Sequence, residues 1–385
     1  MNIIGKINEK KIKAVNTKSY KRYSTDEIVE YINEFPEPQN NMERSYFQYK
    51  CNNKLYGVGA FTSFVRNAFS VFPFFIFLFR KGRYLPLEKM EYIFISDEHK
   101  MDIMPNKYKG SYKQISRAHG WLLGKKEKEI LIGLWKSYPF SYYFLLKNLI
   151  KVANYGWAIH SFKPKEILCT CEYSCTSSFL TEYCHMYNIS HVNIMHGYNI
   201  VDLKCPFSNF DRMSIWENFF INTYHIMRCG TKNFEIEVPS CIQLNEEVIN
   251  NDKQAFTYYT QNFIKDVIPT LLKLRDVIEG KGMQFIIRCH PSYPMDSDDK
   301  SLFSNHTFED CSLIDIEKSI NRANYVIARN STVLYQASKL NKYILIDDMS
   351  LPEEYVESRK KGAFLWENEK TYVLSQFIKD TTDCL

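Results

Sequence analysis

A largely apolar run that stops at a histidine and a proline constrains this chain more than any other feature. The run covers 285–289 and leads into His290 and Pro291. A run of this length and composition is typical of a buried strand, which here carries a titratable side chain to its carboxyl end. A second such run, 325–329, is followed by a polar turn and then by apolar residues at helical spacing. Strand, polar turn and helix in this order predict a parallel α/β unit.

The polar turn after the second run consists of Asn330, Ser331 and Thr332. It supplies two hydroxyl groups and several backbone N–H groups at the expected N-terminus of a helix. Hydrogen bonding and the helix dipole both favour an anion such as phosphate at that position. A histidine and a phosphate cradle at strand ends in one half of the chain suggest nucleotide chemistry.

The other half of the chain repeats the α/β pattern. A strand over 166–171, a helix over 177–187 and a strand over 191–195 form a βαβ unit that carries His196 to the carboxyl edge of a sheet. Gly197 then allows a sharp turn beside a ligand. An earlier strand over 91–95 leads to Asp97 and Glu98, which we consider as a base or as substrate contacts.

At 385 residues the chain exceeds what one hydrophobic core usually serves, so we expect two domains. We place their boundary between 235 and 236, beside a polar hinge. The second domain opens with a long helix, because apolar residues recur every three to four positions from Phe256 to Ile278. The last helix of the chain is a candidate to pack back on the first domain.

An aromatic segment, 57–83, stands out in the first domain. Residues 67–79 carry no charge and are rich in phenylalanine, with arginines on both sides. A membrane-spanning helix needs about 20 apolar residues, and Pro73 interrupts this run. We weigh equally a segment that lies in a membrane interface and a buried helix or exposed loop of the first domain.

The formal net charge of +5 is modest and the basic residues are dispersed, which favours anionic substrates or acidic lipid over nucleic acid. The eleven cysteines are irregularly spaced and the first residues are polar, so we expect reduced thiols in a cytoplasm. Cys169 and Cys171 alternate with Leu168 and Thr170 along a predicted strand. We interpret them as small hydrophobic residues of a strand rather than as zinc ligands.

Taken together, the His-Gly pair at His196, the Arg-Cys-His-Pro motif at 288–291 and the Asn-Ser-Thr turn at 330–332 resemble bacterial surface-polysaccharide glycosyltransferases of the GT-B architecture. The resemblance covers roughly 160–348. It implies an α/β protein with two Rossmann-like parallel-sheet domains that face a central cleft. Residues 1–235 would form the acceptor side and 236–385 would bind the nucleotide-sugar donor.

Two branches of these enzymes share parts of the pattern. Resemblance to bacterial sialyltransferases and polysialyltransferases implies that His290 contacts or protonates the phosphate of a CMP-linked donor, which Ser331 and Thr332 hold. The glycerophosphotransferases of teichoic acid synthesis carry both histidine motifs, and in that case His196 is a candidate base.

The chain departs from both branches. The acidic pair of the sialyltransferases is followed by glycine, whereas Asp97 and Glu98 are followed by histidine, so the base stays open between His196 and this pair. Where many GT-B enzymes hold the ribose with glutamate, this chain has Gln336. Pro291 of the motif is a further candidate at the donor site. Arg288 and Arg329 are candidates to add charge at the phosphate, although strand alternation leaves open whether either points to solvent.

The sequence therefore predicts a glycosyltransferase that moves a sialic-acid-like sugar from its CMP form to a lipid-linked or surface glycan, such as capsule, O-antigen or lipooligosaccharide. The Asp-x-Asp triplet at 296–298 lies in an aspartate-rich loop that we interpret as solvated rather than metal-binding, so we expect no metal and no cofactor other than the donor. We expect the enzyme in the cytoplasm, at the inner face of the membrane, without a nucleic-acid partner. The alternatives are a CDP-glycerol or a UDP- or GDP-hexose donor, and a non-catalytic partner in polysaccharide assembly.

Overall fold

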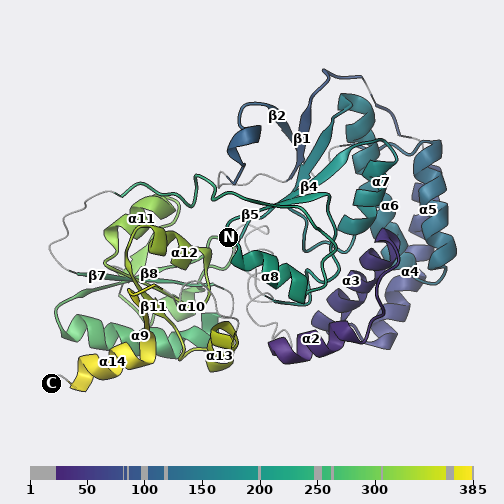
Figure 1. Ribbon diagram of the computed structural model, residues 1–385. Coiled ribbons are helices and arrows are strands. Elements are labelled where there is room, and N and C mark those ends of the chain that lie inside the picture. Colours follow the sequence, from purple (N-terminus) through teal and green to yellow (C-terminus); the bar gives the residue numbers. More distant parts are fainter. Residues whose placement is uncertain are drawn as a thin grey trace. The chain divides into compact units, whose positions relative to one another are not determined.

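The computed structural model describes residues 23–80, 82–84, 86–96, 103–116, 120–197, 201–246, 254–261, 264–304, 307–360 and 368–383 (Figure 1). The chain divides into two compact units between Cys241 and Ile242. Asp97 and Glu98 lie outside the described residues.

The first unit opens with three helices and continues as alternating strands and helices. Its elements are α2 (Thr25–Asn33), α3 (Asn41–Leu55), α4 (Ala60–Phe79), β1 (Tyr92–Ile95), the short 3₁₀ helix η1 (Asn106–Tyr108), β2 (Tyr112–Ile115), α5 (Lys125–Ser137), α6 (Tyr142–Phe162), β3 (Glu166–Cys169), α7 (Ser177–His185), β4 (Ser190–Ile194), β5 (Arg212–Ile215), α8 (Phe219–Ile226) and β6 (Phe234–Ile236).

The six strands of the first unit form one parallel sheet in the order β2-β1-β3-β4-β5-β6. Alternate residues of each strand pack on opposite faces. Ile93 and Ile95 of β1 belong to a large core with helices α5, α6 and α7, whereas Phe94 packs in a smaller core on the other face. The strand order reverses between β1 and β3, which is where open α/β sheets bind ligands.

The second unit is a second α/β repeat. Its elements are β7 (Ala255–Tyr259), α9 (Ile264–Gly280), β8 (Gln284–Arg288), α10 (Ser297–Lys300), β9 (Phe308–Glu309), α11 (Ile316–Arg322), β10 (Tyr325–Ala328), α12 (Thr332–Lys339), β11 (Tyr343–Ile346), α13 (Pro352–Lys360), β12 (Thr371–Val373) and α14 (Leu374–Asp383).

All six strands of the second sheet are parallel, in the order β12-β11-β10-β7-β8-β9. Counted from β7, this is the 3-2-1-4-5-6 order of dinucleotide-binding folds, and the order reverses between β7 and β10. The last helix, α14, packs through Leu374 and Ile378 in the core of this unit. The prediction of an α/β protein with two Rossmann-like parallel sheets is confirmed.

The prediction of a long helix from Phe256 onward is wrong for its first residues. Residues 255–259 form strand β7, all of them buried, and helix α9 begins at Ile264. Apolar residues at 256 and 259 fit one helical face, but they fit a strand buried on both faces equally well. Pairing with β8 and β10 on its two sides makes β7 a central strand.

The aromatic segment of the first unit forms a helix, α4, that contains Pro73. Among the described residues, α4 is the helix long and apolar enough to cross a membrane by length and composition. Phe74 and Leu78 are buried against the rest of the unit, whereas most phenylalanines on the other face are exposed.

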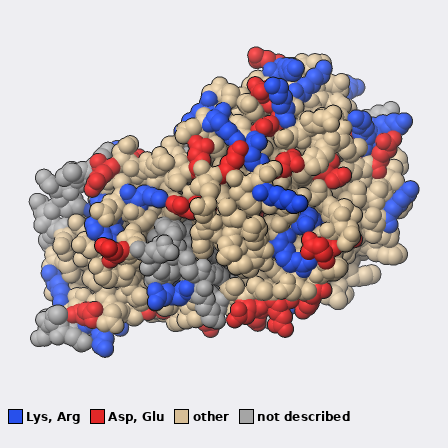
Figure 2. All heavy atoms as spheres, viewed as in Figure 1, with Lys and Arg blue, Asp and Glu red and all other residues tan. Residues whose placement is uncertain are grey.

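Lysines and arginines are interspersed with aspartates and glutamates on the face that Figure 2 shows, without a single continuous basic stripe. This distribution agrees with the modest net charge of +5.

Candidate active site

A histidine and a buried carboxylate meet at the carboxyl edge of the first sheet. Strand β3 ends at Cys169 and is followed by Glu172, and strand β4 ends at Ile194 and is followed by His196. The Nδ1 atom of His196 lies 3.0 Å from Oε1 of Glu172. The Glu172 side chain has no exposed surface, whereas 30% of the His196 side chain is exposed.

The loop that carries Glu172 is held from a distant helix. Gln48 of α3 donates hydrogen bonds from Nε2 to the backbone carbonyls of Glu172, at 2.8 Å, and Lys204, at 2.7 Å. Tyr173 presents its ring edge-on to the imidazole of His196, with centroids 5.5 Å apart. These contacts fix both members of the pair before any ligand binds.

The pair has the arrangement of an oriented general base. An ionised carboxylate only accepts hydrogen bonds, so Nδ1 of His196 donates to Glu172 and the lone pair lies on Nε2. The buried carboxylate sets this tautomer and stabilises the imidazolium that forms when Nε2 takes a proton. Sequence reasoning named His196 and its neighbour Gly197 but missed Glu172. The available signal was a carboxylate directly after a predicted strand.

His290 lies in a tight turn after β8. The backbone N–H of Tyr293 donates to the carbonyl of His290 at 2.9 Å, and Pro291 occupies the second position of this turn, which its fixed φ suits. The N–H of Ser292 donates to Nδ1 of the imidazole at 3.0 Å. The proton of the neutral ring is therefore on Nε2, where it is a hydrogen-bond donor.

Two further effects act on His290. Burial of the ring by the surrounding protein lowers the pKa of His290, although the residue keeps an exposed surface. The hydrogen bond from Ser292 also favours the neutral form, because protonated Nδ1 cannot accept it. The ring lies beside Tyr293, with centroids 5.2 Å apart. His290 is thus prepared to donate from a neutral ring at neutral pH.

The Asn-Ser-Thr turn lies where β10 ends. Ser331 is the N-cap of α12, and its Oγ accepts the N–H of Val333 at 3.3 Å. Thr332 is the first residue of the helix. Gln261, just beyond the end of β7, donates a hydrogen bond to the carbonyl of Asn330. Because the strand order reverses between β7 and β10, this turn lies at the ligand-binding position of the sheet.

The end of β7 also connects this turn to His290. Thr260 accepts the N–H of His290 on its hydroxyl at 3.4 Å and donates its own N–H to the carbonyl of Arg288 at 3.0 Å. Thr260 and Gln261 are consecutive, so one short segment contacts both motifs. The structure thereby brings together the two signals that lie forty residues apart in the sequence.

Three other candidates are buried, and two of them form ion pairs within the protein. Arg288 is buried and pairs with Glu309, and it also donates to the carbonyl of Ile314 at 2.9 Å. Gln336 is buried within α12, with 1% of its surface exposed. The related Arg329 is buried as well and pairs with Glu354 at 3.3 Å. The charges of both arginines are balanced within the protein, so we leave them out of the phosphate site.

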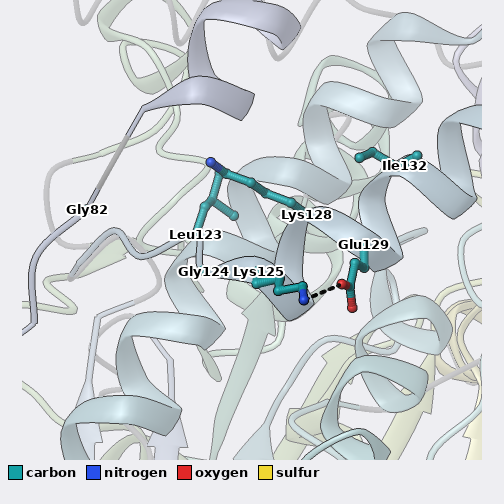
Figure 3. A pocket seen from close by; sticks show the side chains of 7 residues that line it. All are labelled: Gly82, Leu123, Gly124, Lys125, Lys128, Glu129 and Ile132. Carbon is teal, nitrogen blue, oxygen red and sulfur yellow. Dashed lines mark ion pairs between the residues drawn. The ribbon is translucent and has the colours of Figure 1, made fainter.

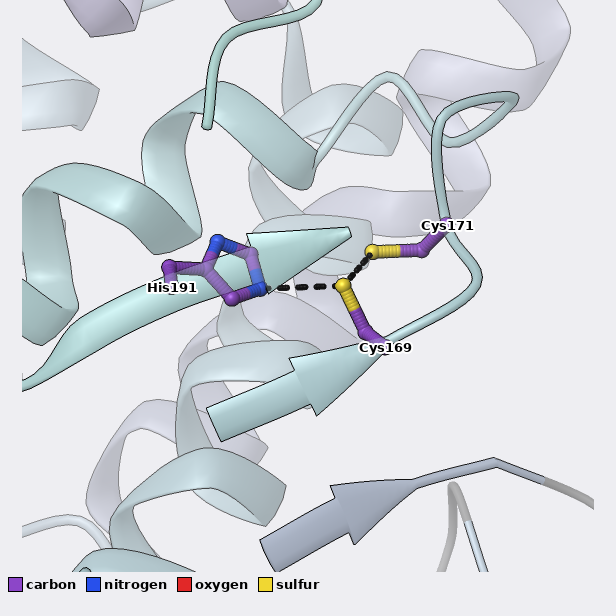
Figure 4. A group of neighbouring side chains, drawn as sticks. All are labelled: Cys169, Cys171 and His191. Carbon is purple, nitrogen blue, oxygen red and sulfur yellow. Dashed lines mark hydrogen bonds between the residues drawn. The ribbon is translucent and has the colours of Figure 1, made fainter. Parts of the chain in front are cut away.

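Just before Glu172 in the chain, Cys169 and Cys171 form a polar cluster with His191 of β4 (Figure 4). The two Sγ atoms are 2.9 Å apart, and Nε2 of His191 is 3.3 Å from Sγ of Cys169. Within the described residues, these three side chains are close enough to share one metal ion.

The same cluster is satisfied by its own hydrogen bonds. Nδ1 of His191 contacts the hydroxyl of Thr181 at 2.8 Å, and the hydroxyl of Tyr155 lies 3.1 Å from Nε2. The hydrogen bond between the thiols lowers the pKa of Cys171 to about 5. Cys169 is therefore a buried strand residue, as expected, but Cys171 is a polar group rather than a small hydrophobic one.

The comparisons with known proteins find solved structures whose backbone is similar to that of this chain, but no similar sequence. No protein-family model and no curated protein sequence matches the chain. Among solved structures, a protein assigned as a UDP-N-acetylglucosamine 2-epimerase of Listeria monocytogenes is 9% identical, with a TM-score of 0.43 over 73% of this chain and 89% of that one.

Two transferases are also among the similar structures. The spinosyn rhamnosyltransferase SpnG is 9% identical, with a TM-score of 0.36 over 76% of this chain and 89% of that one. The wall teichoic acid polymerase TagF is 11% identical, with a TM-score of 0.39 over 89% of this chain and 92% of that one. At these scores the similarity does not decide the function of this chain.

Proposed function

We propose that this protein is a glycosyltransferase that moves a sugar from a nucleotide donor to a hydroxyl group of a bacterial surface glycan. The observation that carries this proposal is the Glu172–His196 pair at the carboxyl edge of a parallel sheet. A partly exposed imidazole whose tautomer is set by a buried carboxylate is what the deprotonation of a hydroxyl group requires.

The reaction assigns one role to each unit. Nε2 of His196 takes the proton of the acceptor hydroxyl, and the oxygen attacks the anomeric carbon of the donor sugar. The bond from that carbon to the phosphate oxygen breaks, and the oxygen leaves with the electron pair on the nucleotide. Nε2–H of His290 and the N-terminus of α12 at Ser331 stabilise the negative charge that develops there.

We favour a CMP-linked, sialic-acid-like donor because the His-Pro motif at His290 and the hydroxyl-rich turn at Ser331 resemble those of bacterial sialyltransferases. The ribose would be held by groups other than Gln336, which is buried. The proposed chemistry uses hydrogen-bond donors on the phosphate and assigns no step to a metal ion. The acceptor would be a lipid-linked or surface glycan, reached from the cytoplasmic face of the membrane.

A second candidate is transfer of glycerol phosphate from CDP-glycerol. One observation supports it: His196 is paired with Glu172, as a general base requires. His196 is also the histidine that resembles the candidate base of the teichoic acid glycerophosphotransferases. The same base then takes the proton of a hydroxyl group that attacks the phosphorus bearing the glycerol. The bridging P–O bond breaks, and CMP leaves with the electron pair.

A panel of ligands separates these candidates. CMP, CDP-glycerol, UDP, UDP-glucose and GDP would each be added, and the midpoint of thermal unfolding measured. A ligand at a hundred times its dissociation constant stabilises the protein by about 2.7 kcal/mol. CMP is the leaving group of both candidate reactions, so stabilisation by CMP that is lost in His290→Ala supports a cytidine donor. CDP-glycerol then separates the two candidates: stronger stabilisation by CDP-glycerol than by CMP supports the second candidate, and stabilisation by CMP without a further gain from CDP-glycerol supports the sialyltransferase assignment. If no nucleotide stabilises the protein, the transferase proposal fails and a non-catalytic role in polysaccharide assembly takes its place.

A further inference from the structure

Helix α4 presents an apolar face that the described residues of the protein do not cover. Five phenylalanines of this helix are between 70% and 79% exposed, and Ile76 is 49% exposed. Together they form what we call the α4 face: Phe61, Phe64, Phe69, Phe72, Ile76 and Phe79. Their spacing of three to five residues places them along one side of the helix. Soluble proteins rarely leave a contiguous aromatic surface of this kind in water.

The opposite side of α4 is firmly packed in the first unit. Phe74 has no exposed surface and Leu78 is 6% exposed, and both belong to the core that α6 dominates. The ring of Phe75 meets Trp135 and that of Phe77 meets Trp121, with centroids 5.7 Å and 5.4 Å apart. The helix therefore cannot leave the unit to cross a bilayer without exposing this core.

Basic side chains border the α4 face. Arg66 lies on the helix, Arg80 is its C-cap and Arg83 follows, all of them exposed. Two of the three are held by aromatic rings, since the guanidinium of Arg80 lies 5.0 Å from the centroid of Trp121 and that of Arg66 lies 5.6 Å from the centroid of Tyr143. These contacts keep the cations beside the apolar surface.

A shallow hollow continues this border beyond the end of α4 (Figure 3). It has a volume of about 570 Å³ and lies between Gly82 and the first turns of α5. Lys125, Lys128 and the apolar Leu123 and Ile132 line it, together with Glu129, which pairs with Lys125 at 4.0 Å. The excess positive charge of the hollow suits an anionic surface rather than a neutral one.

We infer that the α4 face docks into the interface of a bilayer that contains anionic lipid, with α4 parallel to the membrane plane. The phenylalanines enter the boundary between headgroups and acyl chains, and the bordering arginines and lysines stay at the level of the lipid phosphates. A helix of 20 residues is about 30 Å long, which provides a long line of contact. This inference goes beyond the reaction and holds whichever donor the enzyme uses.

The test is co-flotation of the purified full-length protein with vesicles of phosphatidylcholine alone and with added phosphatidylglycerol. We expect binding to the anionic vesicles that weakens as salt is added. The triple variant Phe64→Ser/Phe69→Ser/Phe72→Ser should lower the partition coefficient by about a hundredfold or more, because three large apolar side chains no longer enter the interface. Lys125→Glu/Lys128→Glu should reduce binding to the anionic vesicles while leaving weak binding to the neutral ones.

Phe140→Ser is the matched control, because Phe140 is 85% exposed but lies outside α4, between α5 and α6. It should bind vesicles like the unchanged protein. All substituted side chains are on the surface, so an unchanged midpoint of thermal unfolding will show that the variants are folded.

Three results of the flotation experiment overturn the inference: no flotation of the unchanged protein, flotation of the triple variant to the same extent, or equal loss in Phe140→Ser. Light scattering tests whether a second copy of the chain, rather than a membrane, covers the α4 face. A dimer that the triple substitution converts to a monomer would show that a second copy covers the α4 face. Vesicle binding is measured without donor or acceptor, so its failure leaves the transferase proposal untouched.

Discussion

Glu172 and His196 lie just beyond the ends of two different strands of the first sheet and meet 3.0 Å apart, with the carboxylate buried and the imidazole partly exposed. Residues 172 and 196 are separated by helix α7, so only the parallel pairing of β3 and β4 brings them together. This relationship gives the sharpest prediction about the reaction.

Glu172→Gln should lower kcat by about 10²–10⁴-fold, with little change in the KM for the donor. The amide keeps the size of the side chain, but it no longer stabilises the imidazolium and it allows the wrong tautomer. Steady-state kinetics with the donor identified by thermal unfolding will measure the effect. Glu217→Gln changes a carboxylate just beyond the end of β5, at the same edge of the sheet, and should have a much smaller effect. Equal losses in both variants would count against the pair as the base.

Ser331 combines two roles that substitutions can separate. Ser331→Ala removes the N-cap of α12 and should lower the free energy of unfolding by about 1 kcal/mol, together with donor affinity. Ser331→Asp keeps a good N-cap, so stability should be close to that of the unchanged protein, but its negative charge repels the donor phosphate. Chemical denaturation and titration with the nucleotide will measure the two effects. If Ser331→Asp binds the nucleotide normally, the phosphate is not held at this turn.

The titration of His290 tests directly whether its ring is neutral at pH 7. Because its pKa is lowered in the folded protein, the ring is neutral at pH 7, and an NMR titration should show a midpoint below the ordinary value of about 6.5. Its contribution to stability should be complete above the unfolded pKa and be lost as the pH falls through the lower folded pKa.

A bound phosphate favours the imidazolium, so saturating nucleotide should raise the midpoint of His290. The resonance is assigned by its absence in His290→Gln. In Ser331→Asp the same addition should leave the midpoint where it was. A midpoint that does not respond to the nucleotide in the unchanged protein would place His290 outside the donor site.

The ion pair of Arg288 and Glu309 should act on stability rather than on the donor. Arg288→Ala leaves Glu309 buried without its partner and should lower the free energy of unfolding by about 3–5 kcal/mol. The double variant Arg288→Met/Glu309→Leu removes both charges and should recover most of this loss. Arg322→Ala, an exposed arginine of α11, should change stability by less than about 0.5 kcal/mol. A loss of nucleotide affinity in the double variant at unchanged stability would return Arg288 to the site.

Local patterns in the sequence determined most of the α/β framework. The apolar runs that end at His196 and His290, and the turn at Ser331, were placed correctly because a strand, an N-cap and a helix are each encoded within a few neighbouring residues. Residues 256–259 were misplaced because apolar spacing is compatible with both a helix and a strand buried on two faces, and only the sheet's order decides between them.

The tertiary structure alone decided what each side chain contacts. Strand alternation left the direction of Arg288 open, and the packing against Glu309 buried it. The composition of α4 allowed a buried helix, a loop or a membrane-facing segment, and the packing of Phe74 on one side exposed Phe72 on the other. Glu172 is a candidate for the catalytic pair only because β3 and β4 are neighbours in the sheet and bring it beside His196. Propensity and periodicity act over a few residues, whereas contacts between distant segments depend on how strands order themselves and which faces meet.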